Sequence, residues 1–206
     1  MIRVAALQTH PLWGEVERNL AEAGRLAEQT PARLHVLPEL FNTGYLFRDR
    51  AELAPLAETY PDGRTCRFLA ALSGDCGSVV AGGFAERAPD GRLYNSAALF
   101  DRGRPLGCYR KIHLFDTERR VFDPGDAPPR ALDSSCGRLG PMICFDWIFP
   151  ETARCLALEG ARILVHMANL VLPYCQEAMP VRCLENRIFA VTANRVGEER
   201  RLGEML

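Results

Sequence analysis

The order in which strand-like and helix-like segments follow one another is the feature that most limits how this chain can fold. Apolar runs at residues 2–8 and 34–37 flank a segment, 15–29, whose apolar side chains recur at helical spacing. Hairpin-forming segments follow, and the C-terminal half returns to strands that alternate with helices. This order predicts a layered α/β fold built around a mixed sheet.

Apolar periodicity and turn residues set the expected boundaries. The expected strands are 2–8, 34–37, 78–86, 94–101, 105–110, 139–145, 163–167 and 188–193, and the expected helices are 15–29, 64–72, 150–160 and 176–186. No repeat or low-complexity linker interrupts the 206 residues, so we expect a single domain over residues 1–206.

Three chemically capable side chains lie just beyond predicted strands: Glu39, Lys111 and Cys144. Ligand crevices in layered α/β folds form at strand ends. Lys111 is also the only lysine among 25 lysine and arginine residues. Arginine replaces lysine at most surface positions but not where a compact ammonium must contact a single atom. Lys111 is therefore a candidate for a chemical role.

These three side chains could together hydrolyse an acyl compound. A carboxylate in a dry crevice can take the proton of a thiol, which then attacks a carbonyl carbon. An ammonium and a backbone N–H can stabilise the resulting oxyanion, and water would release the acyl group from the sulfur. This chemistry needs no metal and no organic cofactor. Taken singly, each of the three residues has a plain structural interpretation, as a core thiol, a turn cap and a surface cation.

Three sequence blocks carry a resemblance to a known family. They read LPELFNTGY (residues 37–45), YRKIHLF (109–115) and MICFDWIFPE (142–151). In this order they resemble the signature blocks of the nitrilase superfamily of carbon–nitrogen hydrolases. The resemblance implies an α-β-β-α sandwich whose members usually pair as homodimers or higher homo-oligomers. Members usually continue beyond the segment that resembles residues 194–197, so it also implies a C-terminally short domain that lacks C-terminal strands.

The resemblance also assigns roles to individual residues. It implies Cys144 as nucleophile, Glu39 as general base, and Lys111 as oxyanion donor together with the backbone N–H of Phe145. It further implies a second glutamate in the site, and Glu118 occupies that place; the alternative is a solvated loop carboxylate.

Two aromatic residues of the blocks, Tyr45 and Trp147, are candidates for lining the substrate pocket. Core packing is an equal alternative for each of them.

The residues after the nucleophile indicate the branch of the superfamily. Nitrilases usually carry Cys-Trp-Glu, whereas here Phe145 and Asp146 follow Cys144. This resembles the amidase and carbamoylase branches, so we expect a small amide or carbamoyl substrate and release of ammonia. Two alternatives stay open: an inert, shortened homologue that acts as a binding or assembly protein, and an acyltransferase that uses the same thioester.

Composition limits the partners and the compartment. The net charge is −1, so no general attraction to nucleic acid or to an anionic membrane is expected. No apolar run approaches membrane-spanning length, and the N-terminus does not resemble a signal peptide. The eight cysteines form no CxxC pair and show no zinc-finger spacing. We therefore expect a cytoplasmic protein with reduced cysteines.

Overall fold

The computed structural model describes residues 1–205, and the side chains of residues 1–203. Its strands are β1 (Val4–Ala6), β2 (Leu34–Val36), β3 (Val79–Arg87), β4 (Leu93–Asp101), β5 (Arg104–Arg110), β6 (Leu132–Ser134), β7 (Gly137–Ile143), β8 (Ile163–Ala168), β9 (Phe189–Asn194), β10 (Arg200–Arg201) and β11 (Glu204–Met205). Its α-helices are α1 (Val16–Gln29), α2 (Arg50–Leu53), α3 (Arg64–Asp75), α4 (Glu118–Val121), α5 (Pro150–Leu158) and α6 (Cys175–Asn186), and two 3₁₀ segments are η1 (Ala54–Leu56) and η2 (Cys144–Ile148).

The strands form two mixed sheets and a small C-terminal hairpin. The first sheet has the order β1-β2-β3-β4-β5, with β1, β2 and β3 parallel and β3, β4 and β5 antiparallel. The second has the order β6-β7-β8-β9, with only the β6–β7 pair antiparallel. Element order alone suggested one mixed sheet; the chain instead divides its strands between two, as the family resemblance implied.

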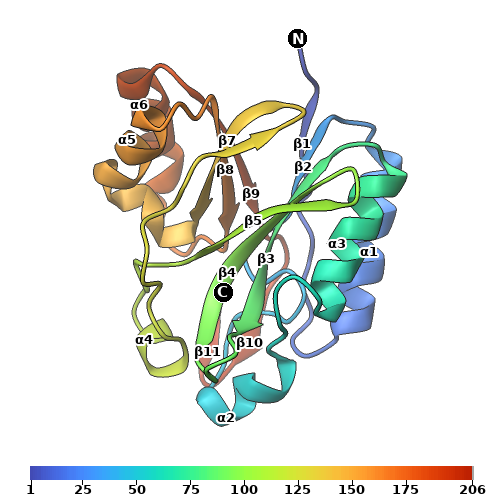
Figure 1. Ribbon diagram of the computed structural model, residues 1–206. Coiled ribbons are helices and arrows are strands. Elements are labelled where there is room, and N and C mark those ends of the chain that lie inside the picture. The colour runs from blue at the N-terminus through green and yellow to red at the C-terminus, as the bar shows by residue number, and fades with distance from the viewer. Residues whose placement is uncertain (206) are drawn as a thin grey trace.

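The two sheets pack face to face between two layers of helices, which gives an α-β-β-α sandwich (Figure 1). Helices α1 and α3 cover the first sheet, and α5 and α6 cover the second. The strands carry apolar residues on both faces because both faces are buried. In β3, Val79 and Ala81 face the other sheet, whereas Val80 packs with the residues of α1 and α3.

Most expected elements are present, and one boundary difference bears on the site. Strand β7 ends at Ile143, one or two residues earlier than expected, because the chain turns at Cys144. Cys144 has a φ of 38°, in the left-handed region, and Asp146 Oδ2 accepts a hydrogen bond of 2.8 Å from the Ile143 N–H. The thiol therefore stands on a tight turn at the strand end.

Strand directions bring separate parts of the sequence together where several strands of the first sheet end. Strands β2 and β3 are parallel, and β4 is antiparallel to both β3 and β5. The C-terminal ends of β2, β3 and β5 therefore lie at the same end of the sheet as the start of β4. Glu39 and Lys111 follow β2 and β5, and Asn95 is the third residue of β4. The topology thus gathers their side chains at one place.

None of the helices found within residues 1–205 combines the length and the apolar character that crossing a bilayer requires.

Candidate active site

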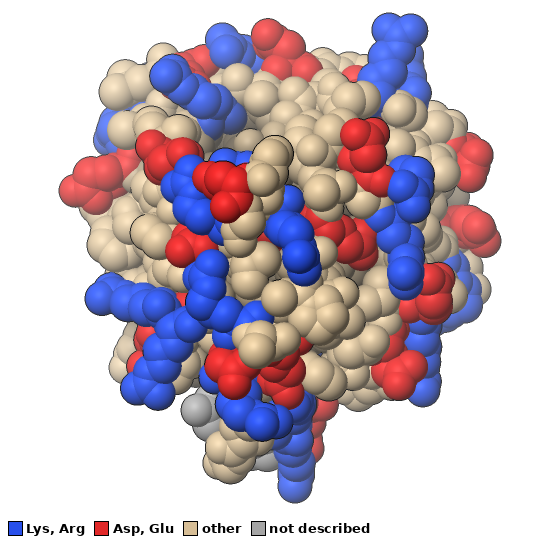
Figure 2. Space-filling model, turned by 60° about the horizontal axis from the view of Figure 1, so that its bottom comes forward, with Lys and Arg blue, Asp and Glu red and all other residues tan. Residues whose placement is uncertain are grey.

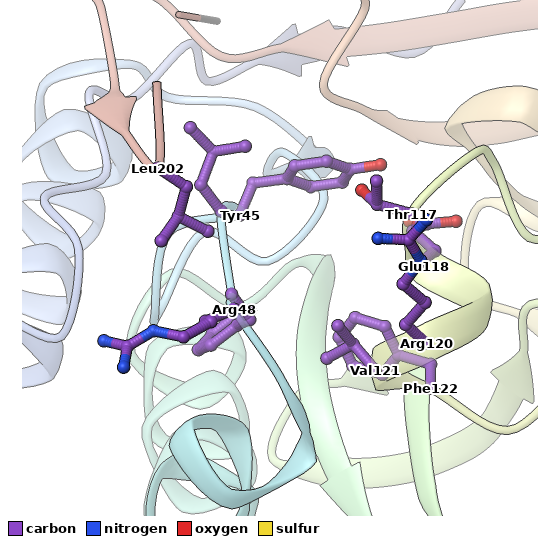
Figure 3. Close-up of a pocket in the computed structure, with 10 residues that line it drawn as sticks. Tyr45, Arg48, Thr117, Glu118, Arg120, Val121, Phe122 and Leu202 are labelled. Atoms are coloured by element: carbon purple, nitrogen blue, oxygen red, sulfur yellow. The ribbon is translucent and has the colours of Figure 1, made fainter. Parts of the chain in front are cut away.

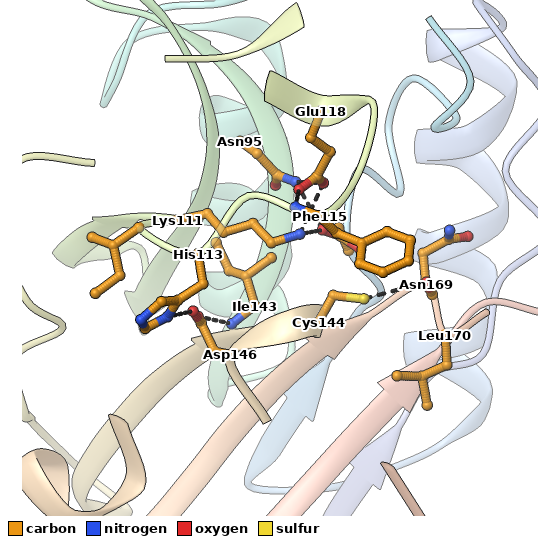
Figure 4. Close-up of polar contacts among 12 residues, drawn as sticks. Asn95, Lys111, His113, Phe115, Glu118, Ile143, Cys144, Asp146, Asn169 and Leu170 are labelled. Carbon is orange, nitrogen blue, oxygen red and sulfur yellow. Dashed lines mark hydrogen bonds and ion pairs between the residues drawn. The ribbon is translucent and has the colours of Figure 1, made fainter. Parts of the chain in front are cut away.

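The Lys111 ammonium is completely buried and lies between two carboxylates. Its Nζ donates to Glu39 Oε1 at 2.7 Å and to Glu118 Oε1 at 2.8 Å. Asn95 Nδ2 donates to the same two oxygens, at 2.7 Å and 3.0 Å. Glu118 Oε2 accepts the backbone N–H of Phe115 at 2.7 Å, which fixes the second carboxylate (Figure 4).

The second oxygen of Glu39 is free to accept a proton. Among the residues whose side chains are described, no group donates a hydrogen bond to the buried Glu39 Oε2. Close backbone packing holds Glu39 in place, since a Cβ at Gly83 would lie 2.7 Å from the Glu39 Cα. Only glycine permits this approach of β3 to the segment after β2.

Cys144 enters the site from the second sheet. Figure 4 shows Cys144 on one side of the site and Lys111 with Glu118 on the other. The thiol donates to the backbone oxygen of Asn169 at 3.3 Å. The carbonyl of Cys144 accepts a 2.9 Å hydrogen bond from His166 Nε2. Burial lowers the pKa of His166, so its ring is neutral and its Nδ1 accepts from the Thr192 hydroxyl at 3.0 Å.

Asp146 holds the turn that carries the thiol. Besides the Ile143 N–H, its Oδ2 accepts the Tyr109 hydroxyl at 3.0 Å, and its Oδ1 lies 2.7 Å from His113 Nδ1. Asp146 is completely buried, so these donors replace the water that the carboxylate loses on folding. This bracing was not recognised from sequence, although Asp146 lies inside the third block.

Burial and charge set the protonation of Glu39 and Lys111. Burial raises the pKa of Glu39 to about 7, although the charge of Lys111 opposes this rise. Burial alone would lower the pKa of Lys111, but the carboxylates of Glu118 and Glu39 raise it above its usual value. The lysine is therefore charged at neutral pH, and Glu39 can gain or lose a proton there.

The Cys144 thiol is protonated when the enzyme is at rest. Burial raises its pKa well above the usual value, the negative charge of Glu39 adds to this, and Lys111 partly opposes it. A protonated thiol can react by transferring its proton to an ionised carboxylate during the attack. The site thus has the groups for nucleophilic acyl chemistry. Among the side chains described, those of residues 1–203, no cluster of three or more histidine, cysteine or acidic groups is arranged to hold a metal ion.

Comparison with known proteins identifies the family. The family profile described as carbon-nitrogen hydrolase matches residues 3–205. The chain belongs to the carbon-nitrogen hydrolase family. The expected membership of the nitrilase superfamily is thereby confirmed, and the protein is a carbon–nitrogen hydrolase of the amidase-like branch.

Curated relatives of this carbon-nitrogen hydrolase cover nearly its whole length. It is 47% identical over 205 residues to a protein named nitrilase from Pyrococcus abyssi, which covers 98% of this chain and 78% of that protein. It is 32% identical over 219 residues to an N-carbamoylputrescine amidase from Solanum lycopersicum, over 97% of this chain and 72% of that one.

Solved structures confirm the sandwich fold. A carbon-nitrogen hydrolase from Helicobacter pylori G27 superposes with a TM-score of 0.88 at 27% identity, over 96% of this chain and 75% of that one. An amidase from Nesterenkonia sp. AN1 superposes with a TM-score of 0.85 at 25% identity, over 100% of this chain and 82% of that one. In that amidase, acrylamide has added to the active-site cysteine.

The aromatic candidates of this carbon-nitrogen hydrolase fall into different places. Tyr45 and Glu118 both line one cavity. Figure 3 draws the residues of its wall. The Phe145 ring contacts Phe115 and Phe149 in a separate hollow. Trp147 packs in the core between the second sheet and helices α5 and α6. Of the two interpretations that the sequence left open for Trp147, the structure favours core packing.

The loop that carries Tyr45 is fixed by a buried carboxylate that the sequence did not single out. Glu199 accepts the N–H groups of Tyr45 and Leu46, the latter at 2.6 Å, and pairs with Arg195 at 2.6 Å. Both ionic side chains are nearly inaccessible to solvent. The segment after β9 therefore braces one wall of the cavity.

Proposed function

We propose that this enzyme hydrolyses small amides through a thioester on Cys144. Its Sγ attacks the carbonyl carbon of the amide while its proton passes to Glu39. The C–N bond then breaks, and the leaving nitrogen takes that proton and departs as ammonia. Water, activated by the same carboxylate, cleaves the thioester and releases a carboxylic acid and the free thiol.

The observation that supports this proposal is the buried ion network beside the thiol. Lys111 keeps its charge because Glu39 and Glu118 both accept hydrogen bonds from its ammonium. The positive charge is therefore in place before the negative charge of the intermediate develops. Such preorganised charge in a dry site is the largest single contribution in many acyl-transfer enzymes. We assign Lys111 Nζ and the N–H of Phe145 as the two donors to the oxyanion.

Glu118 and Asn95 are proposed to position the reacting groups. Glu118 Oε1 accepts from Lys111 Nζ, and Asn95 Nδ2 donates to the Oε1 atoms of Glu39 and Glu118. Glu39 Oε2 is left for the proton of the thiol. In this assignment Glu118 fixes the orientation of the Lys111 ammonium, and Asn95 fixes the rotation of the Glu39 carboxylate.

Product analysis tests the reaction. Aliphatic primary amides should give ammonia and the corresponding acid in equal amounts, and added hydroxylamine should divert only part of the acyl group to hydroxamate. Hydroxamate or ester formation without hydrolysis would favour the acyltransferase. Absence of both products from folded protein across a panel of amides and carbamoyl compounds would favour the inert binding protein.

The pH dependence of kcat/KM should report Glu39. Only the ionised carboxylate can accept the proton, so activity should rise with pH through an apparent pKa of about 7. At pH 6 we expect roughly one tenth of the plateau value. Steady-state kinetics from pH 5 to 9 on a neutral amide measure this. If kcat/KM instead rose with the pKa of an ordinary glutamate, the assignment of Glu39 as the base would be contradicted.

We also propose that the single domain pairs with a second copy through the layer of α5 and α6. Large apolar side chains are exposed on it: Leu158 of α5 at 79% and Leu184 of α6 at 80%. Phe189, at the start of β9, is also exposed, at 74%. Exposed apolar surface of this kind marks interaction sites. Light scattering should give twice the monomer mass, and Leu184→Glu should return the protein to a monomer. A monomeric wild-type protein would contradict this pairing.

A further inference from the structure

A cavity of about 250 Å³ opens beside the proposed reaction centre. Its walls come from the loop after Glu39, the short helix α4 and the C-terminal hairpin (Figure 3). The lining is mixed: Leu46, Phe47, Val121, Phe122 and Leu202 are apolar, and Tyr45, Arg48, Thr117, Glu118 and Arg120 are polar.

Two lining residues connect this cavity to the reacting groups. Glu118 forms part of the wall and also accepts the hydrogen bond from Lys111 Nζ at 2.8 Å. Tyr45 forms another part of the wall, and its phenol lies close enough to the site that Cys144 is among the groups that raise its pKa. A substrate whose carbonyl reaches Cys144 would therefore extend its other end into this cavity.

Arg120, an exposed residue of α4, brings a positive charge without a protein partner to the cavity wall. In Figure 3 its side chain rises from α4 toward Tyr45 and Thr117, whereas Arg48 points away from the centre. Arg48 is also paired with Glu52 at 3.5 Å. Within residues 1–203, whose side chains are described, the Arg120 guanidinium has no hydrogen bond and no ion pair. Glu118 pairs with Lys111, which it shares with Glu39, and forms no ion pair with Arg120.

The groups of the cavity wall suit a carboxylate that ends a short apolar chain. Figure 2 brings this end of the molecule forward and shows basic side chains gathered in its lower half with acidic ones between them. A guanidinium offers two parallel N–H groups that match the two oxygens of a carboxylate. The apolar part of the wall, which includes Phe47, Val121 and Phe122, suits a short methylene chain.

We propose that Arg120 binds a carboxylate at the far end of the substrate, so that the enzyme selects small amides that carry an acid group. This inference rests on the proposed amide hydrolysis, with the same Cys144 site. Arg120 acts as a specificity-determining residue: it holds the end of the substrate that does not react. Amides that end in an ammonium group should be rejected by the same charge.

Two matched sets of amides test the proposal at two lengths. The first set is succinamate, butyramide and β-alaninamide, and the second is glutaramate, valeramide and 4-aminobutyramide. Within each set only the distal group changes, from carboxylate to methyl to ammonium. In at least one set, kcat/KM of the wild-type enzyme should be about tenfold or more higher for the acid than for the neutral amide, and lowest for the amine.

Variants of α4 assign the preference to one side chain. Arg120→Gln should reduce the acid-to-neutral ratio to within about threefold while turnover of the neutral amide stays near the wild-type value. Arg120→Glu should favour the amine. Arg119→Gln is the matched control, because Arg119, like Arg120, is exposed on α4 but lines a different hollow. It should retain the wild-type ratio.

The outcomes separate this inference from the proposed function. Hydrolysis of the neutral amides with no preference for the acids, or an acid preference that survives in Arg120→Gln, overturns the role of Arg120 and leaves amide hydrolysis standing. Hydrolysis of none of the six amides, without an acyl group on Cys144, overturns both.

Discussion

Replacing Cys144 with alanine is expected to lower kcat for amide hydrolysis by about 10³-fold or more, because the bond to the acyl group can no longer form. The side chain is buried on a turn that backbone contacts hold: His166 donates to the Cys144 carbonyl, and Asp146 accepts the Ile143 N–H. The variant should therefore stay folded. Ammonia release and thermal unfolding, measured on the same preparations, check both expectations.

Cys155 supplies the matched control for this substitution. It is an exposed free cysteine on α5, whereas the ion network is buried. Cys155→Ala should keep the wild-type kcat. Turnover in Cys144→Ala close to that of Cys155→Ala would remove Cys144 as nucleophile.

Replacing Lys111 with methionine is expected to reduce both activity and stability. Two buried carboxylates would lose their shared cation, and breaking a buried ion pair in this way costs about 3–5 kcal/mol. Loss of one oxyanion donor should lower kcat by about 10²–10³-fold. Without the opposing charge, the pKa of Glu39 should rise further above 7, so residual activity should move to higher pH. A pH profile of kcat/KM separates this shift from simple unfolding.

Two further variants keep the Lys111 prediction testable. Lys111→Arg should not restore activity, since a planar guanidinium is too wide for a site in which one nitrogen contacts two carboxylate oxygens at 2.7 and 2.8 Å. Lys111→Met combined with Glu118→Gln removes one charge of each sign and should recover much of the folding stability without recovering kcat. Full activity in either variant would end the oxyanion assignment.

The main strands could be predicted from sequence because they are buried on both faces. Residues such as Val79, Val80 and Ala81 form a continuous apolar run, since neighbours along β3 pack alternately against the second sheet and against helices. Because the runs are continuously apolar, the division of the strands between two sheets could not be predicted from them. Apolar runs do not specify which strand they pair with, and that choice depends on contacts between distant segments.

Short elements could not be predicted for a different reason. Helices α2 and α4 have four residues each, and β10 and β11 have two, so the apolar pattern has no room to repeat within any of them. Asp49 accepts the Glu52 N–H at the start of α2, which is a capping signal that the sequence analysis did not use.

The candidate site was partly visible in the sequence. Glu39, Lys111 and Cys144 stand out because each follows a strand within a characteristic block. Asn95 and His166 do not, because they lie inside strands made mostly of apolar residues, where a single polar side chain resembles a satisfied core residue. Only the strand register shows that Asn95 lies beside the end of β5, whose next residue, Lys111, donates its N–H to the Asn95 carbonyl at 2.9 Å.

The central claim is that Cys144 carries the acyl group during turnover, and mass spectrometry of the acid-quenched enzyme tests it most directly. Wild-type enzyme mixed with excess butyramide should gain the mass of one butyryl group, and peptide mapping should locate it on Cys144. The acyl group should disappear once the amide is consumed, and it should never form in Cys144→Ala. An acyl group on any other residue, or butyrate production by Cys144→Ala at the wild-type rate, would contradict the account.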